Sequence, residues 1–297
     1  MRTLLKLAAP LIALGASAAA GASSMQSYDK EVPAEPRGVV EISNTSGSVD
    51  VMGWDRPAVG IHGEVGDGVE RVEVTSEAGR TIIKVVVPGG SSRHGEANLH
   101  VHVPRSSELH VATVSADTNI LGVDGVQRLN AVSGDVNTEI AAADLDLKTV
   151  SGDIRIKGHG QPARLHVSTV SGDVHLEHGA GDLEASSVSG TLMVSLDSAR
   201  SVHARTTSGD LTFKGRMTRG SSFDAASVSG DLDVRAASEG GYSYEVSTFS
   251  GDISNCFGAK NDKDGVVGHS LSGARGDAAG HMRLKTMSGD IELCDRD

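Results

Sequence analysis

The residues of this chain with the clearest chemical potential are aspartates that recur at nearly constant spacing in the tripeptide Ser-Gly-Asp. Carboxylates that a regular fold brings into a file could bind calcium, which prefers oxygen ligands. Calcium-binding β-rolls, however, use a Gly-Gly-x-Gly-x-Asp nonapeptide, and this sequence has neither that motif nor that spacing. We therefore interpret the tripeptide as a structural turn, keep calcium as the less favoured alternative, and expect no cofactor.

Folding alone accounts for the residue types of this turn. Glycine reaches the backbone angles of a sharp corner at little cost, and serine and aspartate accept hydrogen bonds from nearby backbone amides. If turns stack, a side chain of one turn can also bond the amide of the next. The predicted turn ladder comprises Ser133, Gly134, Asp135, Ser151, Gly152, Asp153, Ser171, Gly172, Asp173, Ser208, Gly209, Asp210, Ser229, Gly230, Asp231, Ser250, Gly251, Asp252, Ser288, Gly289 and Asp290, with degenerate copies at Ser115-Ala116-Asp117 and Ser189-Gly190-Thr191.

The two cysteines occupy equivalent places relative to this turn. Cys256 lies six residues after Ser250, and Cys294 lies six residues after Ser288. If their repeats are neighbours in a stack, their Cα atoms lie about 5 Å apart, which is within disulfide range. We therefore predict a Cys256–Cys294 disulfide; the alternative is two free, small core residues.

Other candidate sites are weaker. His100 and His102 share one strand face and could begin a metal site, but a solvated strand face is the favoured interpretation. The segment from Gly158 to Ala163 superficially resembles a dinucleotide loop, but it contains Pro162 and no helix is expected after it. No hydrolase signature is present, and aromatic residues make up only 3% of the chain, too few for the platforms of a glycan-acting enzyme. We predict no catalytic, cofactor-binding or metal-binding residue.

The spacing of the turns predicts the architecture that positions these residues. From Ser115 to Ser250 the steps between turns are 18, 18, 20, 18, 19, 21 and 21 residues. Apolar and polar residues alternate on both sides of the tripeptide, as in 145–149 before one turn and 154–156 after it. This alternation predicts that each repeat consists of a strand, the turn and a second strand. We predict an all-β, single-domain parallel β-solenoid with about 18–21 residues per coil, right-handed like most parallel connections.

Residues 1–22 are predicted to be a signal peptide, with Arg2 and Lys6 before a short apolar stretch and small residues at the cleavage region. Residues 23–37 are expected to form a flexible leader, 38–113 irregular N-terminal coils of the same stack, and 114–297 the regular repeats. The last step, from Ser250 to Ser288, spans 38 residues. It is either two coils, with Ser272-Gly273-Ala274 as a decayed turn, or one coil with a Gly-rich insertion near 258–280.

Charge and export limit the partners. The net charge of −12 opposes binding to nucleic acid and to anionic lipid surfaces. No membrane insertion is expected after signal cleavage, and the periplasm, the cell surface or the extracellular space are the predicted locations. The strand edges at the two ends of a solenoid make self-association possible.

The stretch from Val40 to Trp54, the repeated Val-Ser-Gly-Asp units and the segment from Leu284 to Ile291 resemble a bacterial family of exported β-strand-repeat proteins. It is a domain-of-unknown-function family labelled "putative adhesin". The resemblance covers essentially the whole mature chain. It implies a β-solenoid in the cell envelope or outside it, and it transfers no catalytic residue.

These observations predict a non-enzymatic, exported cell-envelope or surface protein that serves as an adhesin or binding scaffold for an unknown protein or glycan of the envelope. One alternative is an accessory factor in envelope-stress signalling that binds a membrane regulator. A polysaccharide-acting β-helix enzyme is the least favoured interpretation.

Overall fold

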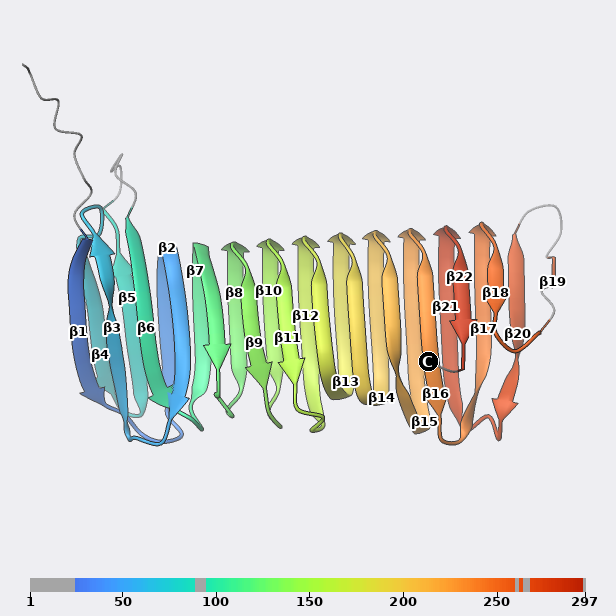
Figure 1. Cartoon of the computed structure of the whole chain (residues 1–297), viewed down its shortest axis with the longest axis horizontal. Helices are drawn as coiled ribbons and strands as arrows, with labels where there is room; N and C mark the ends of the chain where they lie inside the picture. Colours follow the sequence, from blue (N-terminus) through green and yellow to red (C-terminus); the bar gives the residue numbers. More distant parts are fainter. Residues whose placement is uncertain (1–24, 89–94, 260–261, 264–267, 296–297) are drawn as a thin grey trace, which may run out of the picture.

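The computed structural model describes residues 25–88, 95–259, 262–263 and 268–295, and the predicted signal peptide lies outside them. Regular structure in this part of the chain is entirely β, in a single 22-stranded sheet that closes on itself as a stack of coils (Figure 1). None of the described segments is a helix of the length and apolarity that a membrane crossing requires. The predicted all-β, solenoid-like class is confirmed.

The strands fall into three groups along the chain. The N-terminal group is β1 (Met25–Pro33), β2 (Val39–Trp54), β3 (Ala58–Gly66), β4 (Arg71–Glu77), β5 (Arg80–Val86) and β6 (Glu96–Pro104). The central group is β7 (Glu108–Leu121), β8 (Gln127–Ser133), β9 (Val136–Ile140), β10 (Leu145–Ser151), β11 (Ile154–Gly158), β12 (Ala163–Ser171), β13 (Val174–Ser189), β14 (Leu192–Ser208), β15 (Leu211–Ser229) and β16 (Leu232–Ser238). The C-terminal group is β17 (Gly241–Ser250), β18 (Ile253–Asn255), β19 (Asp262–Lys263), β20 (His269–Gly276), β21 (Gly280–Ser288) and β22 (Ile291–Cys294).

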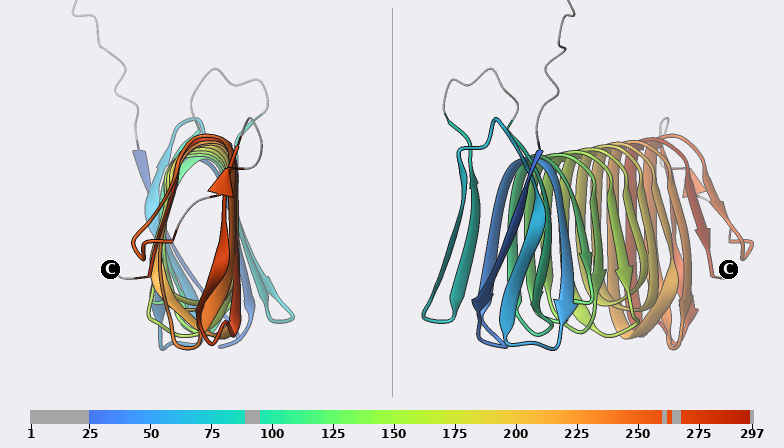
Figure 2. Two further views of the ribbon diagram at one scale, coloured as in Figure 1. Left: turned by 90° about the vertical axis from the view of Figure 1, so that its right-hand side faces the viewer. Right: turned by 60° about the vertical axis from the view of Figure 1, so that its left-hand side comes forward.

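The turn serines lie over one another from coil to coil. Strands of the central group pair in parallel, and the left view of Figure 2 shows the coils superimposed as a flattened ring. Successive serine pairs are Ser46–Ser115, Ser115–Ser133, Ser133–Ser151, Ser151–Ser171, Ser171–Ser189, Ser189–Ser208 and Ser208–Ser229. The varying repeat length does not disturb this registry, because register shifts are confined to the other end of the coil, near Gly179 and Ala199. The right-handed winding remains a prediction.

Period-two alternation places one apolar layer per coil inside the ring. In the coil of β10 and β11, Leu145, Leu147, Ile154 and Ile156 are at most 2% exposed, while the intervening residues face solvent. Most of the same inward positions in other coils carry Val, Leu, Ile, Ala, Phe or Met. In the coil of β8 and β9, buried Gln127 and Thr138 take the places of Leu145 and Ile156 and are hydrogen-bonded to each other. The core is therefore one continuous column, and each coil depends on its neighbours for burial.

Glycine in the turn is required by the close approach of two backbones. Gly152 has φ +118°, a region that side chains with a Cβ rarely adopt, and a Cβ added there would lie 2.2 Å from the carbonyl oxygen of Gly134. The same clash recurs one coil further on, between Gly172 and Gly152. The corner thus packs backbone on backbone, with no space for a side chain.

The N-terminal part corrects the prediction that residues 38–113 form only irregular coils. Strand β2 does begin the stack, pairing in parallel with β7, β5 and β6. Beyond it, however, β4 pairs antiparallel with β5, and β3 pairs antiparallel with β6. A period of two fits either direction of pairing, and here antiparallel strands extend the two broad faces (Figure 1).

The flexible leader predicted for 23–37 is also wrong for the described residues. Met25–Pro33 form β1, which pairs antiparallel with β3 over its whole length, from Met25 opposite Gly66 to Pro33 opposite Ala58. Pro33 is tolerated at the end of an edge strand, where a missing amide hydrogen breaks no ladder. The segment therefore closes the N-terminal end of one face as its outermost strand.

The coils at the C-terminal end do not follow chain order. The final coil, β21 and β22, is inserted between the coil of β15 and β16 and the coil of β17 and β18 (Figure 1). Ser288 accordingly pairs with both Ser229 and Ser250. The spacing of the turns predicted which segments are coils, but the last coil in sequence is not the last in the stack.

In the described residues between Ser250 and Ser288, the 38-residue step contains an insertion and no additional coil. Ser272-Gly273-Ala274 lies in β20, which runs antiparallel to β17. Gly273 packs against the Tyr244 ring, since a Cβ there would meet the hydroxyl oxygen of Tyr244 at 2.4 Å. Strand β20 thus covers the outer edge of β17, and the two-residue strand β19 pairs antiparallel with β20.

The corner contact predicts a large effect of a single added methyl group. Gly152→Ala should lower the free energy of unfolding by about 1–3 kcal/mol, because the Cβ meets backbone that cannot move without shifting the coil above or below. Gly220→Ala is the matched control: Gly220 also has a positive φ, +75°, but nothing lies within 4 Å of its Cβ position. Equal losses in urea unfolding of the two variants would contradict the close-packing argument.

A buried tyrosine predicts a defined alkaline loss of stability. The Tyr242 hydroxyl is buried without a hydrogen-bond partner among the described residues, and burial raises the pKa of Tyr242 to about 12. Tyrosine in the unfolded chain ionises near pH 10. The folded protein favours the neutral form of Tyr242. The free energy of unfolding should therefore keep this contribution in full below pH 10 and lose about 2–3 kcal/mol between pH 10 and about 12.

Tyr242→Phe removes the ionisable group while keeping the ring in place. Urea unfolding at several pH values from 7 to 11.5 should show the variant at least as stable as the parent at pH 7, since an unpaired buried hydroxyl is lost. The difference should grow in favour of the variant above pH 10. Parallel curves for the two proteins would show that Tyr242 does not titrate in this way.

Candidate binding surfaces

The Ser-Gly-Asp turns form a file in which each carboxylate serves the next coil. The amide of Asp153 donates to Oδ1 of Asp135 at 2.9 Å, and the amide of Asp173 donates to Oδ1 of Asp153 at 3.1 Å. The same bond continues through the inserted coil, from the amide of Asp290 to Asp231 and from the amide of Asp252 to Asp290, each at 2.8 Å. One carboxylate oxygen each of Asp135, Asp153, Asp231 and Asp290 is therefore engaged in holding the corner.

Thr191 takes the place of an aspartate in this file and interrupts the aspartate–amide bonds toward the coil of Asp210 only. Its amide still donates to Oδ1 of Asp173 at 2.8 Å, but its own side chain offers no carboxylate to the coil of Asp210. Arg155 lies 3.5 Å from Asp153 and 3.9 Å from Asp135, so a cation of the chain itself neutralises part of the file. Amide donors and this guanidinium offset the mutual repulsion of the stacked carboxylates.

An exposed apolar row, which we call the corner row, runs beside the turns. It is formed by the residue that precedes each turn serine, in stack order Val114, Val132, Val150, Val170, Val188, Thr207, Val228, Met287 and Phe249. The eight apolar members are 47–60% exposed. With one residue per coil at about 4.8 Å, the row is about 38 Å long. It lies between buried threonine or serine positions on one side and the file of exposed aspartates on the other.

The two broad faces are mosaics of opposite charges. His166 lies 3.4 Å from Glu184 in the next coil, and Lys157 on the other face lies 3.8 Å from Glu139. Exposed pairs of this kind contribute little to stability, about 0–1 kcal/mol each. Their main effect is to leave the faces polar and flat, so that the corner row is the longest apolar feature of the described surface.

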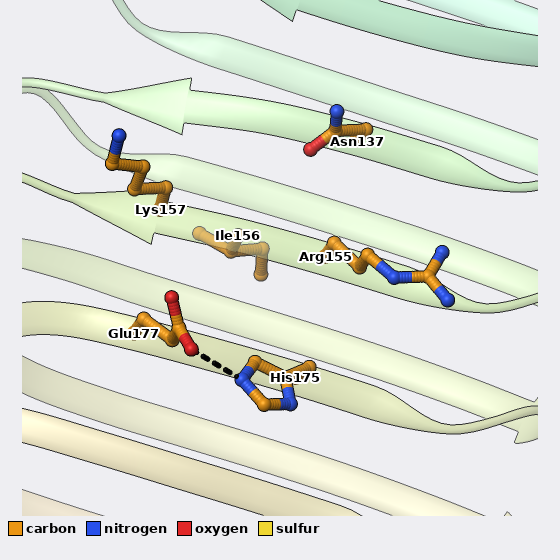
Figure 3. A pocket seen from close by; sticks show the side chains of 6 residues that line it. All are labelled: Asn137, Arg155, Ile156, Lys157, His175 and Glu177. Atoms are coloured by element: carbon orange, nitrogen blue, oxygen red, sulfur yellow. Dashed lines mark hydrogen bonds and ion pairs between the residues drawn. The ribbon is translucent and has the colours of Figure 1, made fainter.

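A shallow depression lies on one of these faces, over β9, β11 and β13 (Figure 3). It measures about 290 Å³ and is lined by Asn137, Arg155, Ile156, Lys157, His175 and Glu177. Figure 3 shows these side chains standing next to one another on three adjacent strands, without converging on a common point. The depression is a dip between outward rows, not an enclosed pocket.

Two polar groups of this depression, His175 and Glu177, are hydrogen-bonded to each other. His175 lies 2.8 Å from Glu177, and this hydrogen bond, together with the positive charge of the ring when protonated, lowers the pKa of Glu177. The carboxyl is thus held in its ionised form, whereas a general acid needs a raised pKa. The depression can offer hydrogen bonds and charges to a surface ligand, but its geometry does not assemble an acid–base pair.

The two cysteines form the disulfide that their spacing indicated. Cys256 and Cys294 are bonded, with their Cα atoms 4.9 Å apart, and both lie where neighbouring coils end. The bond joins the outermost coil, of β17 and β18, to the inserted coil of β21 and β22 beneath it, so it links the last two coils of the described stack. It therefore fixes the terminal strand β22 against β18.

The structure also places the two histidines that were considered for metal binding. His100 and His102 both face outward on β6, and His62 on β3 is paired directly with His100. Sequence reasoning did not single out His62, because nothing in the spacing indicated that β3 and β6 are antiparallel neighbours. The sequence pattern indicated only that His62 occupies an outward position in a short apolar strand.

Fold and surface together define a strand-repeat protein of the β-solenoid type, with long outer faces and an apolar edge. A family model described as Toastrack DUF4097 matches residues 31–195 and again 67–294. The two matches together span most of the chain, and the protein belongs to this family. A comparison with curated proteins found no match.

Several solved structures are similar over nearly their whole length. A "putative adhesin" from Parabacteroides merdae matches with a TM-score of 0.42 and 10% identity, covering 90% of this chain and 96% of that one. A "putative adhesin" from Parabacteroides distasonis gives 0.40 and 11%, covering 90% and 97%. A "putative lipid binding protein" from the same organism gives 0.40 and 9%, covering 91% and 98%. At these scores the likeness carries no functional argument.

The disulfide predicts a redox-dependent stability. Replacing both cysteines by serine should lower the free energy of unfolding by about 2–4 kcal/mol, because the bond closes a 38-residue loop. Reductant should lower the melting temperature of the parent protein and leave that of the double variant unchanged. Free thiols at both positions in non-reduced peptides of exported protein would show that the bond is not formed.

Proposed function

We propose that this protein is an exported, non-catalytic binding scaffold of the cell envelope or cell surface, and that the corner row is its contact surface. The occupant we assign to the row is an envelope protein that presents an extended apolar segment flanked by basic side chains. The observation that carries the proposal is the continuity of the row: eight apolar side chains, each about half exposed, on a surface whose broad faces are charged.

The apolar side chains of the row are not needed by the fold at these positions. The residues next to them, such as Thr149 and Thr169, point inward and donate to the carbonyl groups of Ser151 and Ser171. Thr207 occupies the same position with a polar side chain and its coil keeps the registry of the others. Exposed contiguous apolar surface on a folded chain is typical of interaction sites.

The chemistry of the partner follows from the groups beside the row. The exposed aspartates of the turns run along one side, and the chain as a whole has a net charge of −12. A segment with basic residues beside its apolar ones therefore complements both features. A protein fits better than a glycan, because sugars stack on aromatic rings and Phe249 is the one aromatic residue of the corner row.

Export is supported by two features of the chain. The first 22 residues have the composition of a signal peptide. The Cys256–Cys294 disulfide requires an oxidising compartment to persist. Both features support a location in the periplasm, on the cell surface or outside the cell.

Site-specific photo-crosslinking in the native cell tests the contact surface. A photoreactive phenylalanine analogue at Val150 or Val170 should give a crosslink to one envelope protein, which mass spectrometry identifies. The control position is Lys214, an outward residue on another face, where no such crosslink is expected. Introducing Val132→Asp and Val188→Asp beside the probe should abolish the product.

The outcome also separates the proposal from its alternative. A membrane-anchored signalling regulator as the partner would make the protein an accessory factor in envelope-stress signalling, with the same contact surface. Crosslinks of equal yield from Val150 and Lys214, or none from any position of the row, would overturn the proposed surface.

A further inference from the structure

Three histidines gather at the N-terminal end of one broad face, where antiparallel strands extend the stack. His62 on β3 and His100 on β6 are direct partners across an antiparallel pair, and His102 follows two residues after His100. Residues two apart on a strand face the same side, so all three imidazoles lie on the outer surface. This arrangement does not involve the corner row and is independent of the function proposed above.

Two aspartates flank this pair of histidines in the same row of the sheet. Asp29 on β1 is the partner of His62, and Asp50 on β2 is the partner of His100, so the order across four strands is Asp-His-His-Asp. The Nδ1 atom of His62 lies 3.2 Å from Asp29, and the Nδ1 atom of His100 lies 3.1 Å from Asp50. A carboxylate at Nδ1 fixes the proton there and leaves Nε2 with a free lone pair.

Gly60, the cross-strand partner of His102, has no side chain, and the space above it is shared by Trp54 and His62. A Cβ placed there would lie 3.0 Å from the edge of the Trp54 ring and 3.7 Å from Nε2 of His62. The His62 ring therefore lies beside the Trp54 ring, close to His102. The ring centroids of His62 and His102 are 6.1 Å apart with an interplanar angle of 74°.

This separation is close to that of two imidazoles on one metal ion. With zinc–nitrogen distances of about 2.0–2.1 Å and a tetrahedral angle, the centroids of two ligating rings lie about 5 Å apart. The nitrogens of the three rings are not yet within ligand distance of one another. The His62 and His102 centroids would have to approach by about 1 Å to match the geometry of two ligands on one ion. His62 and His100 have side chains that are 49% and 60% exposed, so both can turn without disturbing the core.

His102 is the fixed member of the group. Its ring stacks on Trp54 with centroids 5.0 Å apart, and its Nδ1 is buried without a hydrogen-bond partner among the described residues. Burial, with the neighbouring imidazoles of His62 and His100, lowers the pKa of His102.

We propose that His62, His100 and His102 bind a divalent transition metal, with Zn²⁺ as the ion best matched, and that Asp29 and Asp50 orient the first two ligands. Three imidazoles with an open fourth position suit Zn²⁺, and the flanking carboxylates supply negative charge close to the ion. Nearby Arg56 is paired with Glu31 and lies over the Trp54 ring.

Zinc binding to the tag-free mature protein tests the site directly. Competition with a chromophoric chelator should show one equivalent of Zn²⁺ bound with a micromolar or lower Kd. His62→Ala and His102→Ala should each weaken binding at least tenfold, and Asp29→Asn with Asp50→Asn should weaken it about 10–100-fold. Co²⁺ in place of Zn²⁺ should give the visible absorption of a tetrahedral complex.

The matched control is His203→Ala, which removes an outward histidine that also lies beside a carboxylate, 3.6 Å from Asp224, but has no neighbouring histidine partner in its row. Its zinc affinity should equal that of the parent. Melting curves verify that the surface variants remain folded. No saturable zinc binding, or the same loss for His203→Ala as for His62→Ala, would overturn the proposal.

Discussion

Close contact between the backbones of neighbouring coils at the glycine corner is the constraint on which the other features depend. Hydrogen bonds between parallel strands set the rise from coil to coil at about 4.8 Å, and the corner must follow that rise without a side chain in the way, as at Gly134 and Gly152. Once the corners coincide, the strand positions on either side of them coincide as well, and the register shifts fall at the other end of the coil. The inward layers, the aspartate–amide bonds, the corner row and the ion pairs of the faces are all consequences of that one alignment.

The repeated turn made much of this predictable from sequence. The steps of 18–21 residues and the apolar alternation around each Ser-Gly-Asp indicated parallel coils, and the equal offsets of Cys256 and Cys294 indicated neighbouring positions, which the structure shows. The order of the last coils could not be predicted, because spacing identifies equivalent residues and says nothing about which coil lies on which. His62 was missed for a related reason: alternation in β3 and β6 does not reveal that they pair antiparallel.

Both ends of the stack are finished by antiparallel strands. At the N-terminal end β1 and β4 lie outermost on the two faces, and at the C-terminal end β20 lies against β17. A coil that continued the parallel pattern would end in a long, regular edge, which favours unwanted pairing between molecules. An antiparallel strand ends the regular pattern instead, and at the N-terminal end antiparallel pairing also brings side chains of different strands together, as His62 and His100 show.

The inserted final coil has a consequence for the order in which the molecule can assemble. A chain that is made and exported from its N-terminus delivers residues 241–255 before residues 280–294, yet the later segment lies beneath the earlier one. Growth by simple addition of coils therefore stops after β16. The outermost coil acquires its neighbour only when the C-terminus arrives, and a protein shortened by its last two strands would lose a layer from within the stack, not from its end.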